Sequence, residues 1–496
     1  MDARVEPSRV EPSPSPAGPA GLDAETCYRA LVARDRRFDG VFFVAVTTTG
    51  IYCRPICTAR TPGRDRCVFY RRGAEAERAG YRACLRCRPE LAPGAGAVDA
   101  APRLVADAVA RIEAGFLDDG SVDDLATELG VTARHLRRTL TSALGVTPVE
   151  LAQSRRLAMA RQLVLGTDLP LTQIAFASGM GSLRRFNALF RERFGAAPST
   201  LRGRRRLPPP SSLQLRLDYR PPLAWAPLLG FLDARASAGV ELVDGGVYRR
   251  TVRIGDATGW VAVRPDPRRA ALVADVPISL ASALLPLAAR LRALFDLDAH
   301  PEAIDAHLRR DPLLAPRVAA HPGLRVPGAF DGFEVAVRAI LGQQVSVAAA
   351  TTLAGRLAAA FGEPVATPWP GLDRLFPPPA AIATAGEAAV AAVGMPAARA
   401  RAVVALAGAA ERLRLDPHAD PAALTAQLAA LPGIGPWTAA YVAMRAAAWP
   451  DALPSSDLAL RRALGDLPAA DVDARAAPWR PWRSYAVLHL WTGVSP

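Results

Sequence analysis

The spacing of apolar residues divides the first half of the chain into regions of different secondary structure. Residues 41–46, VFFVAV, form a short apolar run that predicts a buried strand. Further on, two similar stretches, 122–145 and 171–195, each show helical spacing interrupted by a glycine-bearing turn. We therefore expect a small strand-containing part followed by a wholly helical one.

Alternating apolar and polar residues open the second half of the chain. The segments VYRRTVRIG and WVAVRPDPRRAALVADV alternate as strands of an antiparallel sheet do. Helices are expected around 223–237 and 280–296. From about Asp298 the spacing is helical to the end, with a Gly-Gln-Gln-Val-Ser turn between two helices in residues 333–357.

Segments rich in proline, glycine and serine mark the boundaries between these regions. The expected fold class is a multidomain protein of α and α+β type. The expected parts are a disordered tail (1–20), a small α/β domain with the cysteines (21–92), an all-α domain (103–203), a small antiparallel α+β domain (213–297) and a second all-α domain (298–496).

Composition and net charge indicate the kind of partner and the cellular compartment of the protein. The chain has 496 residues, half of them hydrophobic, and a net charge of +13, which favours a polyanionic partner. All 60 basic residues are arginine, so genome composition is an alternative reason for the charge. No apolar run is long enough to cross a bilayer, and the first twenty residues lack a signal-peptide core. We therefore expect a cytoplasmic, nucleoid-associated monomer with reduced cysteines and no membrane partner.

The cysteines are concentrated in one short region. Cys53-x-x-x-Cys57 is followed by Cys84-x-x-Cys87, and Cys27 lies upstream. Paired cysteines with short spacing in a reducing compartment predict a four-cysteine site for one Zn²⁺. On spacing alone, a purely structural zinc ribbon is the simpler interpretation.

The surrounding residues favour a reactive site. The segments FFVAVTTTGIYCRPICTAR and YRACLRCRPE resemble the N-terminal zinc domain of the Ada-type adaptive-response proteins. The resemblance implies that Cys53 accepts a methyl group from a methylated DNA phosphate, while Cys57, Cys84 and Cys87 complete the zinc site. A zinc-held thiolate stays ionised at neutral pH, and its methylation removes a negative charge, which should strengthen DNA binding. Cys27 and Cys67 are interpreted as packing residues. Flanking arginines are expected to hold the DNA backbone: Arg54, Arg60, Arg64, Arg66, Arg71 and Arg72.

The stretches 122–145 and 171–195 have the form of two helix-turn-helix units, whose second helices enter the major groove. The pair resembles the AraC-type DNA-binding domain, which implies promoter DNA and RNA polymerase as partners. Side chains able to reach bases are Arg134, His135, Arg137 and Arg138 in the first unit, and Ser182, Arg184, Arg185 and Asn187 in the second. The DNA-binding candidates among them are Arg134, Arg138, Arg184 and Arg185. Roughly half of these contacts are expected to be with phosphate or solvent.

A glycine-bearing turn in LPGIGPWTAAY, residues 431–441, predicts a phosphate-binding hairpin. Gly433 and Gly435 lack Cβ atoms, so backbone N–H groups there can approach a ligand closely. The following helix points its positive end at the same place, which suits a phosphate oxygen. Downstream, a Pro-Ser-Ser turn with Ser456 as N-cap puts Asp457 in the first turn of a short helix. Taken singly, each feature is more often structural.

The order and spacing of these features resemble the helix-hairpin-helix DNA glycosylases, above all the AlkA type of 3-methyladenine DNA glycosylase II. In that family the hairpin grips the DNA backbone, and the matching catalytic carboxylate is Asp457. The family also has a small antiparallel domain in front of the catalytic part, as residues 213–297 predict here.

Two further elements of the family have counterparts in this chain. The wedge that fills the gap left by a flipped base matches Gln344, where the best-known relative has leucine. The residues that match the pocket aromatics, which stack on a flipped base, are Trp437, Tyr441 and Trp491. Trp479 and Trp482, by contrast, are expected in the core.

The resemblances together predict a bifunctional alkylation-response protein. Its glycosylase would release 3-methyladenine and 7-methylguanine from double-stranded DNA, and its zinc domain would sense methylphosphotriesters and regulate transcription. One alternative is a regulator whose glycosylase half only binds DNA, and another is a glycosylase that uses its front half for targeting. Because no cysteine follows Cys87, repair of O6-alkylguanine by thiol transfer is not expected from these residues.

Overall fold

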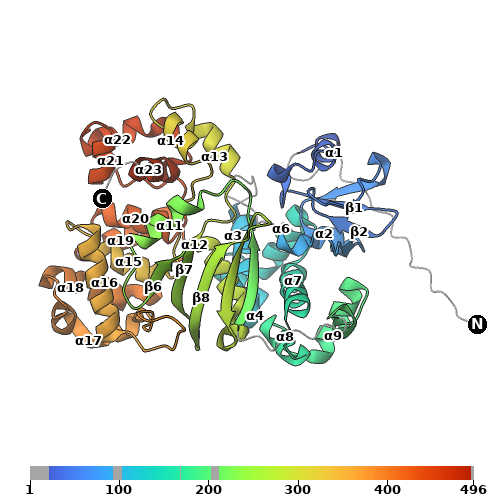
Figure 1. Cartoon of the computed structure of the whole chain (residues 1–496), viewed down its shortest axis with the longest axis horizontal. Coiled ribbons are helices and arrows are strands. Elements are labelled where there is room, and N and C mark those ends of the chain that lie inside the picture. Colours follow the sequence, from blue (N-terminus) through green and yellow to red (C-terminus); the bar gives the residue numbers. More distant parts are fainter. Residues whose placement is uncertain (1–21, 93–102, 168, 203–211, 493–496) are drawn as a thin grey trace, which may run out of the picture. The chain divides into compact units, whose positions relative to one another are not determined.

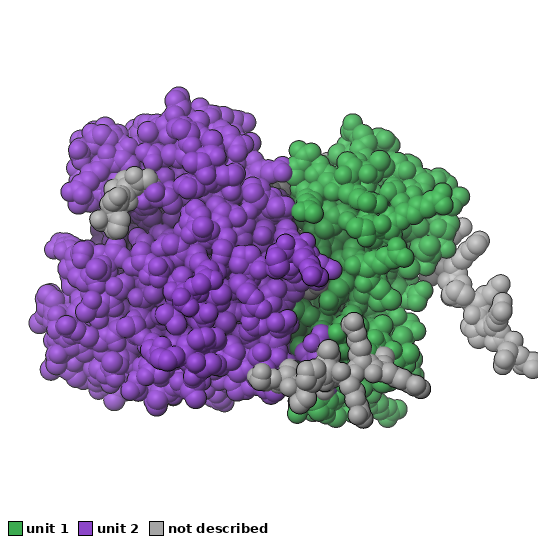
Figure 2. All heavy atoms as spheres, in the orientation of Figure 1, with its two compact units in different colours: residues 1–95, 99–165, 170–205 green, residues 96–98, 166–169, 206–496 purple. Residues whose placement is uncertain are grey.

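The computed structural model describes residues 22–92, 103–167, 169–202 and 212–492. The chain forms two compact units, coloured separately in Figure 2, and Figure 1 labels their elements. The first unit holds the cysteine-containing part and the first set of helices. The second unit holds the antiparallel sheet and the C-terminal helices.

The first unit begins with a four-stranded sheet in the order β3-β1-β2-β4. Its strands are β1 (Phe43–Val46), β2 (Ile51–Cys53), β3 (Cys67–Tyr70) and β4 (Arg82–Ala83). The antiparallel partners of β1 are β2 and β3, whereas β4 runs parallel to β2. Two helices accompany the sheet, α1 (Ala24–Val32) and α2 (Gly73–Arg78). The strand expected over 41–46 is therefore confirmed, and β2 and β4 each end beside a zinc-ligand cysteine.

The remainder of the first unit is helical. Its helices are α3 (Arg103–Ala114), α4 (Phe116–Asp119), α5 (Val122–Glu128), α6 (Ala133–Leu144), α7 (Pro148–Gly166), α8 (Leu171–Ala177), α9 (Leu183–Phe194) and α10 (Pro198–Arg202). Both α6 and α9 start at a side-chain cap, Thr132 or Ser182, and stop at a left-handed glycine, Gly145 or Gly195. The second helices of the two predicted helix-turn-helix units thus begin and end in the same way.

The second unit opens with a five-stranded antiparallel sheet in the order β5-β9-β8-β7-β6. Its strands are β5 (Ser212–Asp218), β6 (Glu241–Asp244), β7 (Val247–Ile254), β8 (Ala257–Pro265) and β9 (Ala271–Pro277). The two expected helices are α11 (Trp225–Asp233) and α12 (Leu284–Leu294), the latter preceded by a 3-10 turn, Ile278–Ala283. The alternating segments of the sequence therefore form strands as predicted.

The α-helices of the second unit that follow the sheet and α12 are connected by turns and loops. They are α13 (Pro301–Leu308), α14 (Ala315–Ala320), α15 (Gly332–Leu341), α16 (Val347–Phe361), α17 (Pro379–Ala391), α18 (Ala397–Ala409), α19 (Pro421–Ala429), α20 (Pro436–Arg445), α21 (Leu458–Ala463), α22 (Ala469–Arg475) and α23 (Arg483–Trp491). A shared apolar core joins α15, α16, α18, α19 and α20. This core fixes the ends of α15 and α20, where the expected wedge and hairpin lie. None of the described helices is both long and apolar enough to span a membrane.

Candidate functional site

Four cysteine side chains converge beside the sheet of the first unit. The ligand atoms of Cys53, Cys57, Cys84 and Cys87 all lie within 4.8 Å of one another, and the sulfur atoms of Cys57 and Cys84 are 4.0 Å apart. Zinc–sulfur bonds of about 2.3 Å in a tetrahedron place sulfur atoms about 3.8 Å apart. The cluster therefore fits one Zn²⁺, and the predicted cofactor site is confirmed.

The arginine nearest to this cluster does not point to solvent. Arg54 is 4% exposed, and its guanidinium pairs with Asp39 and donates to the Cys87 carbonyl at 3.3 Å. The expectation that Arg54 holds the DNA backbone is therefore wrong, because its guanidinium is buried and already paired with the carboxylate of Asp39. Cys27 and Cys67 are buried and lie outside the four-cysteine cluster, in keeping with packing roles.

The two candidate reading helices present their arginines outward. In α6 the buried face is made of leucines, and in α9 it is made of Phe186 and Phe190. Exposed arginines on the other face are Arg134, Arg137 and Arg138 in α6, and Arg184 and Arg185 in α9. Arg137 lies 3.8 Å from a carboxylate oxygen of Asp123, and the contact of these arginines with DNA stays a prediction.

The hairpin between α19 and α20 contains the two glycines that are predicted to hold a phosphate. Gly433 has a φ of +76°, and a Cβ there would lie 2.8 Å from the Cβ of Ala402. A Cβ on Gly435 would meet nothing within 4 Å, so this residue faces open space. Among the described residues, no hydrogen bond uses the backbone N–H of either glycine. Both donors therefore remain available beside the N-terminus of α20.

Asp457 lies where three N–H groups converge. Its Oδ1 accepts the backbone N–H of Leu460 at 2.8 Å and the indole N–H of Trp491 at 3.0 Å. Its Oδ2 accepts the indole N–H of Trp437 at 2.9 Å. Asp457 is itself the N-cap of α21, so the expectation that Ser456 caps this helix is wrong. The carboxylate is thus held in one orientation between two tryptophans.

The two rings that bond this carboxylate belong to a cluster of four aromatic residues. Trp437 stacks on Tyr441 with centroids 5.4 Å apart, and Tyr441 lies 6.2 Å from Trp491. The fourth ring is Phe231 of α11, nearly parallel to Trp491 at 6.5 Å. Sequence motifs gave no sign of Phe231, since it comes from the small antiparallel part, far from the hairpin in sequence. Trp479 and Trp482 are buried, at 1% and 6% exposure, as expected of core residues.

Two arginines stack on the same rings. The guanidinium of Arg235 lies 3.8 Å from the Phe231 ring centre, and that of Arg445 lies 5.0 Å from it. Arg445 also donates to the Tyr441 hydroxyl at 2.7 Å. Burial by itself raises the pKa of Tyr441, but the positive charges of Arg445 and Arg235 outweigh it and hold that pKa below its ordinary value. The side of the aromatic cluster on which Arg235 and Arg445 lie is therefore positively charged.

The expected wedge follows α15. Gln344 is exposed and has a φ of +55°, a left-handed conformation that is uncommon outside glycine. The neighbouring Gln343 donates through Nε2 to the Gly433 carbonyl and to the Thr438 hydroxyl, both at 2.9 Å. Arg399 of α18 donates to the Gln343 carbonyl at 2.6 Å. The wedge loop and the hairpin are thus joined directly, by a residue that the sequence analysis did not single out.

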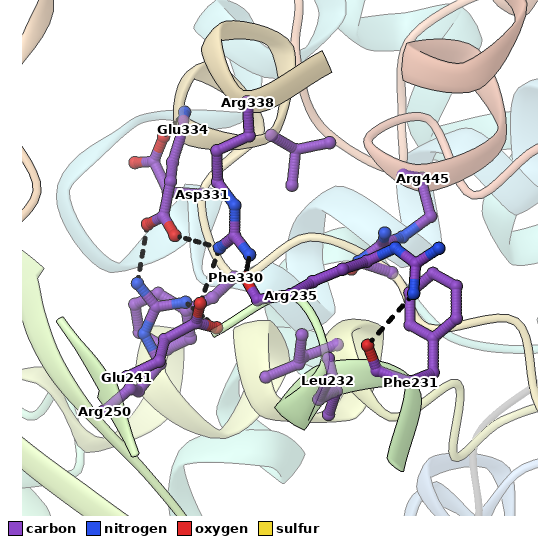
Figure 3. Close-up of a pocket in the computed structure, with 13 residues that line it drawn as sticks. Phe231, Leu232, Arg235, Glu241, Arg250, Phe330, Asp331, Glu334, Arg338 and Arg445 are labelled. Atoms are coloured by element: carbon purple, nitrogen blue, oxygen red, sulfur yellow. Dashed lines mark hydrogen bonds and ion pairs between the residues drawn. The ribbon is translucent and has the colours of Figure 1, made fainter. Parts of the chain in front are cut away.

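Phe231 also lines a hollow with many charged side chains, and ion pairs in this hollow connect α15 to the sheet (Figure 3). Arg250 of β7 pairs with Glu334 of α15 at 2.7 Å, and both side chains are at most 4% exposed. Arg338 of α15 pairs with Glu241 of β6 at 2.6 Å and with Glu334 at 2.9 Å. Since these charges satisfy one another, the network is a structural clamp between sheet and helix. It fixes α15, and so the wedge at its end.

Matches to known families cover both units. Residues 26–90 match the metal binding domain of Ada, and residues 125–204 match a helix-turn-helix domain. Residues 214–331 match the AlkA N-terminal domain, and residues 337–477 match the HhH-GPD superfamily of base excision DNA repair proteins. The chain is therefore a DNA glycosylase joined to a zinc-binding, helix-turn-helix regulator, and double-stranded DNA is its partner. The predicted fold class is confirmed.

One similar protein matches nearly the whole chain, and others match just over half of it. The chain is 43% identical, over 95% of its length and 96% of the relative's, to the "probable bifunctional transcriptional activator/DNA repair enzyme AlkA" of Mycobacterium tuberculosis. It belongs to this family. The DNA-3-methyladenine glycosylase 2 of Escherichia coli is 38% identical and matches 55% of this chain and 95% of its own. A 3-methyladenine DNA-glycosylase from Archaeoglobus fulgidus has the same fold (TM-score 0.50, 23% identity, 56% of this chain and 97% of that one).

Proposed function

We propose that the second unit removes N-alkylated purines, such as 3-methyladenine and 7-methylguanine, from DNA. The observation that carries this proposal is the carboxylate of Asp457, held by the indole N–H groups of Trp437 and Trp491 within a cluster of aromatic rings. An alkylated purine is cationic, and π faces favour a cation. Its glycosidic bond is already weak, so a fixed carboxylate beside the sugar supplies what the reaction still needs.

The proposed reaction divides its steps among these residues. Gly433 and Gly435 hold a backbone phosphate, and Gln344 enters the gap left when the damaged nucleotide turns out of the stack. The base then lies against the aromatic rings. As the bond between C1′ and the base nitrogen breaks, its electron pair leaves with the base, which becomes neutral. Asp457 stabilises the cationic sugar until water adds at C1′ and releases one proton to solvent.

Base release is the direct test of this proposal. Zinc-loaded full-length protein should release 3-methyladenine and 7-methylguanine from DNA treated with a methylating agent. Free bases would be measured by chromatography of the soluble fraction. If methylated DNA is bound tightly and no base is released, the alternative of a regulator with a silent glycosylase half is correct.

We expect the glycosylase to leave an abasic site intact. Glycosylases that also cut the strand generally form a Schiff base between an amine and the sugar. None of the 496 residues is lysine, so no internal amine is available. Borohydride added during turnover should therefore trap no covalent protein–DNA adduct in the second unit. A trapped adduct there would contradict the proposed water addition.

We further propose that the first unit senses methylphosphotriesters and regulates transcription. The Cys53 sulfur attacks the methyl carbon, a thioether forms, and the ester bond breaks with its electron pair on the phosphate oxygen. A bound zinc ion would keep the thiolate ionised. The backbone N–H of Arg54 donates to the sulfur of Cys87 at 3.4 Å, which weakens that sulfur as a nucleophile.

Methylation would also change DNA binding. Four thiolates around Zn²⁺ carry excess negative charge, which repels DNA phosphates. Losing one charge is worth about 1 kcal/mol at 4 Å even in bulk water, so affinity should rise. The outward arginines of α6 and α9 would then hold a promoter, as a monomer in the cytoplasm, where RNA polymerase is the partner to recruit.

A further inference from the structure

A single carboxylate in the first unit connects three elements. Glu77 of α2 accepts hydrogen bonds from the hydroxyl of Tyr52 on β2 and, at 2.7 Å, from the hydroxyl of Ser154 on α7. It also forms an ion pair with Arg193 on α9. The side chains of Glu77 and Arg193 are only 7% and 16% exposed. The strand that carries Cys53 is thereby joined to the second reading helix.

A second set of contacts runs beside the first. Arg161 of α7 is fully buried and donates to the Glu90 carboxylate at 2.9 Å and to the backbone carbonyl of Cys84 at 3.3 Å. Its guanidinium lies 5.2 Å from the ring centre of Phe194, the last residue of α9. Phe194 also packs against the apolar cluster that contains Tyr52. The zinc ligand Cys84 therefore takes part in this interface through its carbonyl, and the zinc ligand Cys53 directly follows Tyr52.

Burial makes these contacts stiff. A surface ion pair between long side chains is mobile and contributes little. A buried pair has few alternatives, because separating it leaves an uncompensated charge away from water. The buried charge of Glu77 is compensated by three partners, which are Tyr52, Ser154 and Arg193. The end of α9 consequently has little freedom to move relative to β2.

We propose that Glu77 is a positioning residue that fixes α9 to the methyl-acceptor strand, so that the zinc site and the second helix-turn-helix grip one DNA duplex at a fixed spacing. This inference rests on the proposed methyl-sensing function. A rigid connection matters because two flexibly joined DNA-binding parts lose ordering entropy on binding, whereas a pre-organised pair does not.

The test uses Glu77→Gln in the zinc-loaded full chain. Glutamine keeps the size of the side chain but removes the charge that holds Arg193. The probe is the duplex that methylated wild-type protein selects from a random-sequence library. We expect roughly tenfold weaker binding to this duplex and little change on random-sequence DNA, because pre-organisation is lost while phosphate contacts remain. The rate of methyl uptake should stay at the wild-type value.

Spacing separates positioning from a general weakening. Hydroxyl-radical footprints define the segments protected by the zinc part and by α9, and one base pair is inserted between them. The insertion should weaken wild-type binding strongly and Glu77→Gln binding much less. Glu25→Gln is the matched control, since it removes one carboxylate charge from a side chain that is 68% exposed. It should behave as wild type.

Other outcomes also decide the proposal. If Glu77→Gln loses its zinc, Tyr52→Phe replaces it and should give the same change in spacing with a smaller loss of affinity. Wild-type affinity and strict spacing in these variants would overturn the inference. If wild-type protein selects no duplex or takes up no methyl group, the proposed function fails instead. Hydrogen exchange of the α9 amides, expected to be faster in Glu77→Gln, then tests the positioning alone.

Discussion

We expect Asp457→Asn to lower the single-turnover rate of 3-methyladenine release by about a hundredfold or more. A fixed charge opposite a developing cation typically contributes that much to a rate. Asparagine retains one oxygen, which can still accept the N–H of Leu460 and cap α21. Folding and DNA binding should therefore survive, and melting temperature and duplex affinity would confirm that they do.

Asp457→Asn also changes the hydrogen bonds that the two tryptophans make to this side chain. Asparagine replaces one carboxylate oxygen with an NH2 group, which cannot accept the indole N–H of Trp437 or Trp491. Trp437→Phe is the informative companion, because it removes one indole donor and leaves the charge of Asp457 in place. We expect it to cost less than Asp457→Asn. Equal losses in the two variants would mean that pocket order, rather than charge, carries the effect.

Asp466→Asn is the matched control for charge. Asp466 is exposed after α21 and has a φ of +59°, a conformation that asparagine tolerates well. The Asp466→Asn variant should release 3-methyladenine at the wild-type rate. Asp451 precedes the same turn in sequence but cannot serve, because it is 8% exposed and pairs with Arg480 and Arg483. A folded Asp457→Asn variant that releases base at the wild-type rate would refute the assignment of the catalytic carboxylate.

Features encoded by local spacing could be predicted from the sequence. The four cysteines occupy two short segments, and the strands β2 and β4 that lead to them pair in parallel. The second helices of the helix-turn-helix units, α6 and α9, have their own caps and terminal glycines, so their ends follow from neighbouring residues. The glycines of the hairpin and Asp457 likewise lie within one short stretch. Each of these features is marked by the spacing of residues within a short segment, even where two such segments, as for β2 and β4, meet only in the fold.

Features that depend on distant partners could not be predicted in this way. Phe231 joins the aromatic cluster only because the small sheet packs on the helices, a contact that no periodicity reveals. Arg54 resembles a phosphate-binding arginine beside a reactive cysteine, yet Asp39 neutralises it in the interior. Glu77 occupies an ordinary helical position, and its three partners come from three other elements. In each case the partner, and not the residue type, determines the role.

The largest effect expected in the first unit is the complete loss of methyl uptake when Cys53 is replaced. Wild-type protein incubated with duplex DNA that carries a methylphosphotriester should gain one methyl group, and peptide mass mapping should find it on Cys53. Mapping on the wild-type protein separates the nucleophile from the other ligands, because Cys57→Ser or Cys84→Ser would disturb the zinc site as well.

The control for this experiment is Cys67→Ser. Cys67 is buried in the same domain, and its sulfur donates to the Gly63 carbonyl outside the four-cysteine cluster. Burial also raises the pKa of the Cys67 thiol to about 11, so it stays protonated at neutral pH and is a poor nucleophile. Cys67→Ser should therefore keep its zinc and take up methyl at the wild-type rate. A methyl group mapped to Cys87, the most exposed of the four cysteines, would contradict the assignment of Cys53 as the acceptor.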